Sequence, residues 1–183
     1  DDIAPDLPHT EIRIYGPPTT SGTRDAFEEL VMAAVSEDMG YDGEYTNIRQ
    51  DGPFIPAGEN DNLIVQKLTQ NKKALGIFGY SFLEENRDRL QASRIDGVDP
   101  TPETIADEDY PVSRSLFFYV KNSHTGEVPG IYDYVELFLS EKMMGDMGYL
   151  KDEGLIPLPD ERREAVRESV LSQEQLTLED LQD

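Results

Sequence analysis

A short polar stretch at residues 19–25 carries the groups best suited to bind an anion. It reads Thr-Thr-Ser-Gly-Thr-Arg-Asp and runs directly into a helix-patterned segment over residues 26–39. Backbone N–H groups at the start of a helix have no partner inside the helix, and the helix dipole makes this end positive. The pattern therefore predicts a cradle for phosphate or another oxyanion.

The residues of this stretch have separate predicted roles. Ser21 and Thr23 offer hydroxyl donors, and Gly22 lets a ligand approach the backbone closely. Arg24 adds a charged, forked donor that suits a tetrahedral oxyanion, and Thr20 is a secondary candidate. Ser, Thr and acidic residues are also common at ordinary helix starts, so the stretch alone leaves both interpretations open.

Composition limits the other partners. The 183 residues include 38 acidic and 16 basic side chains and no cysteine, and the net charge is −22. This charge argues against a nucleic-acid partner, and the missing cysteines rule out disulfides and thiolate metal sites. With only two histidines, we expect neither a metal nor a cofactor. Anion binding remains open, because surface charges are largely screened beyond about 8–10 Å at physiological salt.

Membrane insertion is not expected either. No apolar run approaches the roughly 20 residues that a membrane-spanning helix requires. The chain opens with Asp1-Asp2 and shows no basic and apolar leader, so we expect it to be a mature or truncated product.

The elements that must position the anion loop follow an alternating pattern typical of α/β proteins. The expected strands are residues 11–15, ended by Gly16-Pro17-Pro18, the glycine-containing apolar run 74–80, and residues 115–121. Residues 41–59 have an irregular pattern. Expected helices begin near Asn60, Ser81 and Asp160, further helices follow residue 124, and residues 172–183 form an acidic tail.

Several segments together resemble the periplasmic phosphate-binding proteins of Pst-type ABC transporters. The run Gly-Pro-Pro-Thr-Thr-Ser-Gly-Thr-Arg-Asp-Ala-Phe at residues 16–27 resembles the phosphate-site loop of that family. Residues 74–80, 110–116, 148–150 and 155–158 match in the same order. The resemblance covers residues 11–170, and its specificity comes from the order of the matches.

The resemblance implies a partial type II periplasmic-binding-protein fold of class α/β, in which a full member clamps its ligand between two lobes. It implies a second-lobe α/β portion over residues 1–110. Residues 111–170 would supply a crossover strand and C-terminal helices that pack on the first lobe, and residues 171–183 are the acidic tail. The chain is thus expected to be a C-terminal portion of a longer protein.

The implied function is capture of inorganic phosphate, outside the cytoplasm, for a membrane permease of an ABC transporter. Ser21, Gly22 and Thr23 match the phosphate-contacting Ser-Gly-Thr of the family. Some members carry an arginine four positions before this triplet, where this chain has Pro17, so Arg24 is the expected substitute.

Alternatives remain open at this point. Arg114 follows a Tyr-Pro turn and suits either a structural ion pair or a ligand contact. The same fold can bind sulfate, molybdate or a phosphorylated small molecule. A phosphate-recognising hydrolase is a third reading, but it requires a metal cluster or an activated nucleophile, which the sequence does not display. The expected protein is therefore not an enzyme.

Overall fold

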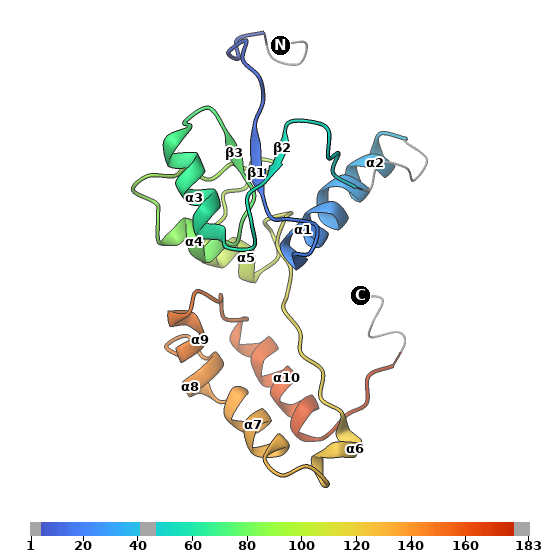
Figure 1. Cartoon of the computed structure of the whole chain (residues 1–183). Helices are drawn as coiled ribbons and strands as arrows, with labels where there is room; N and C mark the ends of the chain where they lie inside the picture. Colours follow the sequence, from blue (N-terminus) through green and yellow to red (C-terminus); the bar gives the residue numbers. More distant parts are fainter. Residues whose placement is uncertain (1–4, 41–46, 178–183) are drawn as a thin grey trace. The chain divides into compact units, whose positions relative to one another are not determined.

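The computed structural model describes residues 5–40 and 47–177 (Figure 1). The chain divides into two compact units, Asp1–Gly97 and Val98–Asp183. Among the described residues, none of the helices combines the length and the apolar character needed to cross a membrane.

A parallel sheet forms the centre of the first unit. It consists of β1 (Ile14–Gly16), β2 (Phe54–Pro56) and β3 (Leu75–Gly76) in the order β2-β1-β3. β1 is therefore the central strand, paired in parallel with both neighbours. The chain runs from β1 to β2 on one side and then crosses β1 to reach β3 on the other side. Because such connections are right-handed, the helices of the two connections lie on opposite faces of the sheet.

The helices of the first unit follow the strands. A continuous helix is made of α1 (Gly22–Phe27), the wider π-helical segment η1 (Glu28–Ala33) and α2 (Ala34–Asp38). After β2 comes α3 (Asp61–Gln70), and after β3 comes α4 (Tyr80–Glu84). Figure 1 shows α3 and the α1–α2 helix on opposite sides of the strands.

The helix predicted over residues 26–39 is confirmed, but it begins earlier, at Gly22. Helical spacing predicts one apolar stripe over Phe27, Leu30, Val31, Ala34 and Val35, but Val35 is 47% exposed. A π-helical turn contains an extra residue, so it rotates every later side chain away from the direction expected of a regular helix. Segment η1 therefore explains why the end of the predicted stripe faces solvent.

Two strand predictions need correction in the first unit. β2 lies inside residues 41–59, which were expected to be irregular; residues 41–46 of that range lie outside the described residues. Its three residues include a proline and are too few to show a strand pattern, so pairing with β1 determines their conformation. The predicted strand 74–80 shortens to β3, and its continuation starts α4 at Tyr80.

A small apolar core lies where α3 meets the sheet. Its buried centre is formed by Tyr15, Ala57 and Ile64. Gly76 permits this close approach, because a Cβ atom at that position would meet the ring of Phe78 at 3.0 Å and the Cγ2 atom of Ile64 at 3.3 Å. Partly buried neighbours complete the cluster: Ile55, Leu68, Ala74 and Phe78.

The second unit is helical, and it contains no strand among its described residues from 99 to 177. Thr101 caps the first helix of this unit, and Pro102 begins it. The final helix begins at Asp160, as expected. In chain order the helices are α5 (Pro102–Ala106), α6 (Asn122–Thr125), α7 (Ile131–Phe138), α8 (Glu141–Met144), α9 (Tyr149–Asp152) and α10 (Asp160–Leu171).

The strand predicted over residues 115–121 is not formed. This segment has no regular secondary structure, and its large apolar side chains are exposed, with Phe117 at 74%. A strand exists only when its backbone groups pair with another strand, and the described part of this unit supplies none. The predicted division into residues 1–110 and 111–170 stays a prediction; the boundary between the two compact units falls between Gly97 and Val98.

One buried arginine ties the helices of the second unit together. Arg163 of α10 donates to Asp146 at 2.9 Å, to Asp160 at 2.6 Å and to the carbonyl of Leu158 at 2.7 Å. Burial opposes the charged form of Arg163, but the carboxylates of Asp146, Glu141 and Asp160 outweigh it and raise the pKa of the guanidinium. Arg163 therefore serves a structural role in this unit.

Candidate anion-binding site

The carboxyl ends of the three parallel strands bring three loops to one edge of the sheet. Residues 17–21 follow β1, residues 57–60 follow β2, and residues 77–79 follow β3. Each loop leads into the N-terminus of a helix. In open α/β sheets, ligands bind at this edge where neighbouring strands send their connections in opposite directions. With strand order β2-β1-β3, the loop after the central strand β1 lies between the other two loops at this edge.

The loop after β1 is held in a defined conformation. Pro17 is fully buried, and the Ser21 N–H donates to the carbonyl of Pro18 at 3.1 Å, which closes a tight turn. Ser21 then caps α1, because its Oγ atom accepts a hydrogen bond from the Thr23 N–H at 3.3 Å. That bond is longer than a typical N–H to oxygen bond, so an anion can replace Oγ as the acceptor.

Two side-chain contacts join the three loops. The hydroxyl of Thr20, in the loop after β1, donates to the carboxylate of Glu59 in the loop after β2. Asp61, the first residue of α3, accepts a hydrogen bond from the Gly79 N–H at 3.1 Å. Asn60 caps α3, since its side chain accepts from the Asn62 N–H at 2.9 Å. The carboxyl edge of the sheet is therefore fixed before any ligand arrives.

Arg24 lies in the first turn of α1 and is only 3% exposed. Its Nε atom donates to Oε1 of Glu28 at 2.9 Å, and its Nη2 atom donates to the carbonyl of Ile48 at 3.1 Å. Nη1 is buried and has no hydrogen-bond partner among the residues that the structure describes. A buried, unpartnered donor on a cation is costly, so Nη1 is the atom of Arg24 that still has hydrogen bonds to donate.

An aromatic ring supports the guanidinium of Arg24. The Arg24 Cζ atom lies 4.8 Å from the centre of the Phe54 ring, a distance typical of a cation–π contact. The same ring fills the space beside Gly16, where an added Cβ atom would lie 2.6 Å from Phe54 Cε2. Gly16 is thus required because the ring passes over the end of the central strand. The Phe54 ring therefore connects the end of β1 to the position of Arg24.

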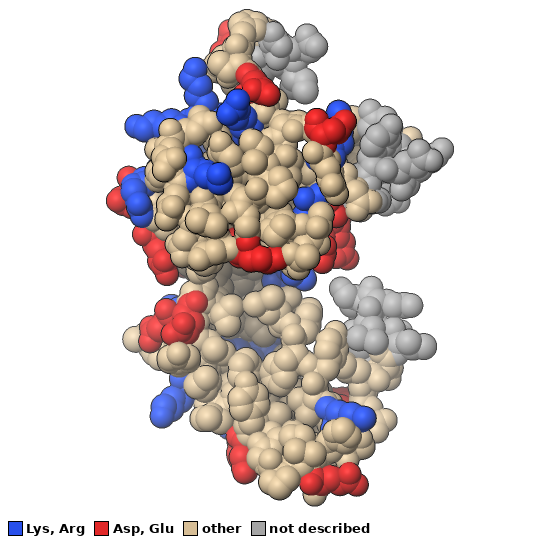
Figure 2. Space-filling view, viewed as in Figure 1, with Lys and Arg blue, Asp and Glu red and all other residues tan. Residues whose placement is uncertain are grey.

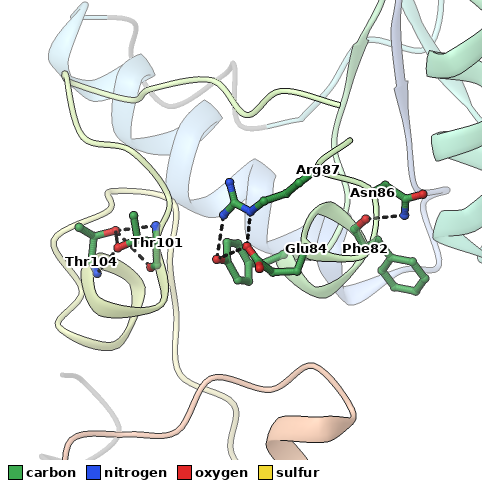
Figure 3. Close-up of polar contacts among 7 residues, drawn as sticks. Phe82, Glu84, Asn86, Arg87, Thr101 and Thr104 are labelled. Carbon is green, nitrogen blue, oxygen red and sulfur yellow. Dashed lines mark hydrogen bonds and ion pairs between the residues drawn. The ribbon is translucent and has the colours of Figure 1, made fainter. Parts of the chain in front are cut away.

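A second polar cluster lies on α4, directly after the loop that follows β3. Tyr80 donates its hydroxyl hydrogen to Glu84 at 2.6 Å, and Arg87 contacts both residues. Figure 3 shows Arg87 turned toward Glu84 beside this helix. Hydrogen bonds from Tyr80 and then from Arg87 lower the pKa of Glu84, whereas burial and the Glu84 hydrogen bond raise the pKa of Tyr80. Because every strong donor and acceptor has a partner, the cluster stabilises α4 and offers no reactive group.

The structure brings most of the predicted site residues together. Thr20, Ser21, Gly22 and Thr23 form one continuous loop and helix start, with Arg24 buried in the same turn. Arg114 belongs to the second unit, where its side chain is exposed, and its role stays a prediction.

Sequence reasoning missed the residues that hold Arg24 and Thr20. Glu28 lies four positions after Arg24, a spacing that places both side chains on one helix face and was a usable signal. Ile48, Phe54 and Glu59 reach the site only through the tertiary fold, and nothing in their spacing indicates it.

Charged side chains of both signs lie on the surface of the first unit. On the face shown in Figure 2, Lys and Arg side chains are interspersed with Asp and Glu, and no single basic field covers the first unit. Within residues 5–40 and 47–177, no group of three or more His, Asp or Glu side chains is placed to hold a metal ion. The groups that this site provides for an anion are therefore hydrogen-bond donors and one buried cation, Arg24.

These features define the fold class as α/β. The chain has a partial type II periplasmic-binding-protein fold, and its anion loop lies at the carboxyl edge of the parallel sheet. A family model described as the PBP superfamily domain matches residues 1–142. Since this match covers most of the chain, the protein belongs to the PBP superfamily.

Individual relatives agree with this assignment. The chain is 30% identical over 165 residues to the phosphate-binding protein PstS of Staphylococcus saprophyticus, a match that covers 86% of this chain and 45% of that protein. It is 29% identical over 160 residues to protein SphX of Synechococcus elongatus, covering 84% of this chain and 42% of SphX. The chain thus spans about half the length of the curated relatives it matches.

Solved structures show the same fold. A possible phosphate binding protein from Planctomyces limnophilus superposes with a TM-score of 0.66 at 29% identity, over 95% of this chain and 58% of that one. PstS from Borrelia burgdorferi superposes with a TM-score of 0.59 at 18% identity, over 83% of this chain and 55% of the other, and this likeness concerns the fold alone.

Proposed function

We propose that this chain is part of a solute-binding protein that captures inorganic phosphate at the Ser21–Arg24 helix start. One observation carries the proposal: a capped helix start at the carboxyl end of the central strand lies beside a buried arginine whose Nη1 atom lacks a partner among the described residues. The names of the relatives PstS and of the possible phosphate binding protein support phosphate as the anion.

The donors of this site act on a tetrahedral anion in a simple way. Phosphate oxygens accept hydrogen bonds from the Thr23 N–H and from the Ser21 hydroxyl, once Ser21 Oγ is released from its capping bond. Arg24 Nη1 supplies a charge-assisted bond. No bond of the phosphate is broken in this scheme, which uses the site residues only as hydrogen-bond donors. The protein is therefore proposed to bind and release its ligand unchanged.

The cellular role follows from this binding. We place the protein outside the cytoplasm, where it would deliver phosphate to a membrane permease of an ABC transporter, as the relatives named PstS suggest. Its acidic surface is consistent with a soluble carrier, since a net charge of −22 keeps molecules apart.

A titration followed by nuclear magnetic resonance tests the proposal on the 183-residue chain. Phosphate should shift the backbone amide signals of residues 21–24 in a saturable way, whereas sulfate and chloride at equal ionic strength should shift them less. The Ser21→Ala variant should weaken phosphate binding by about tenfold, because it removes a hydroxyl donor to a charged ligand.

The matched control is Thr69→Ala, a hydroxyl removed from α3, which should leave the affinity unchanged. Signals of residues 21–24 that do not saturate with phosphate would contradict the proposal. Equal responses to phosphate and sulfate would retain the anion site but replace phosphate with a general oxyanion.

A further inference from the structure

The guanidinium of Arg24 is held along one complete edge. Nε and Nη2 form that edge, and they donate to Glu28 Oε1 at 2.9 Å and to the Ile48 carbonyl at 3.1 Å. An arginine normally grips a carboxylate or phosphate through such an edge. With the edge occupied, the remaining nitrogen, Nη1, has no partner among the described residues.

Glu28 is the residue that fixes this arrangement. Its Oε1 atom accepts the Arg24 Nε–H and, at 3.0 Å, also the backbone N–H of Ile48. The carbonyl of Ile48 accepts from Arg24, so both backbone polar groups of Ile48 are tied to the helix that carries the anion loop. A single carboxylate oxygen thus sets the orientation of the arginine and the position of the chain around residue 48.

The guanidinium is also supported on one face. The Phe54 ring lies beneath it at 4.8 Å, and Phe54 is buried. With one face against the ring and the Nε–Nη2 edge occupied by Glu28 and Ile48, the hydrogens of Nη1 are the donors left for a ligand. The side chain of Glu28 is itself only 16% exposed, so the pair is sheltered from solvent screening.

We propose that Glu28 is a positioning residue for anion binding, an inference that rests on the proposed phosphate site. Because Glu28 occupies one edge of the guanidinium, Arg24 donates to the anion through Nη1 and does not make a bidentate contact through Nε and Nη2. It also balances the charge of the arginine, so the anion meets an ion pair rather than a bare cation.

The two roles of Glu28 predict opposite effects for two variants. Glu28→Gln keeps an oxygen that can accept both hydrogen bonds but removes the negative charge, so phosphate binding should tighten by about fivefold at low salt and weaken more steeply as salt rises. Glu28→Ala removes both hydrogen bonds and releases Arg24, so phosphate binding should weaken by about tenfold or more.

The experiment is a phosphate titration of the 183-residue chain and its variants at low and high salt, read from the amide signals of Thr23 and Ile48. In the wild type, the Ile48 signal should move with the Thr23 signal although Ile48 does not touch the anion. Circular dichroism checks that each variant is folded. Glu29→Gln removes an equal charge from an exposed neighbour and serves as the control.

The outcomes separate this inference from the proposed function. A wild-type chain that fails to bind phosphate would overturn both. If the wild type binds and Glu28→Ala binds equally well, the phosphate site stands and the positioning role of Glu28 is wrong. If Glu28→Ala does not fold, Glu28→Gln decides: an affinity and salt dependence equal to those of Glu29→Gln would overturn the inference.

Discussion

At the scale of single residues, Arg24 shows how a binding group and a structural group can be the same side chain. From the sequence it is a charged residue next to a Ser-Gly-Thr triplet, and its role there looks simple. In the fold it is 3% exposed, paired with Glu28 and in cation–π contact with Phe54. Loss of the side chain therefore changes stability as well as ligand affinity, and the two effects must be measured separately.

The stability effect of Arg24→Ala should be large. The variant leaves the largely buried carboxylate of Glu28 without its cation, and breaking a buried pair in this way costs about 3 kcal/mol. Arg49→Ala is the matched control, because Arg49 forms an ion pair with Asp51 in which both side chains are at least 75% exposed. Such surface pairs contribute about 0–1 kcal/mol.

Urea unfolding followed by circular dichroism measures both free energies of unfolding. Equal values for Arg24→Ala and Arg49→Ala would show that the buried pair has no special role in stability. Arg24→Lys keeps the charge but loses the planar fork, so it should be less stable than the wild type and more stable than Arg24→Ala.

At the scale of elements, the ends of short strands carry the constraints that matter for the site. β1 is only three residues long, and its last residue, Gly16, lies beside the ring that supports Arg24. A change at the strand end is therefore passed to the site through Phe54, without touching the loop itself.

Gly16→Ala should disturb both stability and binding. Its Cβ atom would lie 2.6 Å from the Phe54 ring, and overpacking of this kind costs about 1–3 kcal/mol. Because the ring cannot move without shifting Arg24, phosphate affinity should fall as well. Gly52→Ala is the control, since its new Cβ atom would meet Arg49 only at 3.7 Å, an ordinary contact. Thermal unfolding and the phosphate titration give the two readouts, and a wild-type melting temperature for Gly16→Ala would contradict the packing argument.

Elements with strong local signals could be predicted from the sequence. The caps at Asn60 and Thr101 and the starts of the helices near residues 61, 102 and 160 follow from residue types within a few positions. β2 and the unpaired segment 115–121 were predicted wrongly, because strand formation depends on a partner elsewhere in the chain. The same distinction applies to the site, where Glu28 was within reach of sequence reasoning and Phe54 was not.

At the scale of the whole molecule, acidic residues govern stability through their ion pairs. The net charge of −22 disfavours a compact state by self-repulsion. Some carboxylates oppose this effect. Hydrogen bonds from Tyr80 and Arg87 lower the pKa of Glu84, and the hydrogen bond and charge of Arg162 lower the pKa of Glu108. These groups are more acidic in the folded state than in the unfolded state, so they contribute stability when ionised.

The lowered pKa values of Glu84 and Glu108 determine how the stability of the folded state changes with pH. Both glutamates have an ordinary pKa of 4.5, so their stabilising effect is complete above that pH and is lost as the pH falls through the lower, folded-state values. The double variant Glu84→Gln, Glu108→Gln should therefore lose less stability than the wild type on acidification. Melting temperatures between about pH 6 and pH 3 test this. Glu136→Gln on α7 is the control, and a double variant with the same acid slope as this control would contradict the assignment.

The exposed segment over residues 115–121 has a consequence for the handling of the protein in solution. Its sequence, Ser-Leu-Phe-Phe-Tyr-Val-Lys, is apolar and suits a β-strand, and its backbone lies open, with Leu116 and Tyr119 each 69% exposed. Such segments promote aggregation between chains, and only the mutual repulsion of acidic molecules opposes this. Added salt weakens that repulsion. Salt that screens the repulsion within one folded molecule is therefore expected to make concentrated solutions of the chain aggregate more readily.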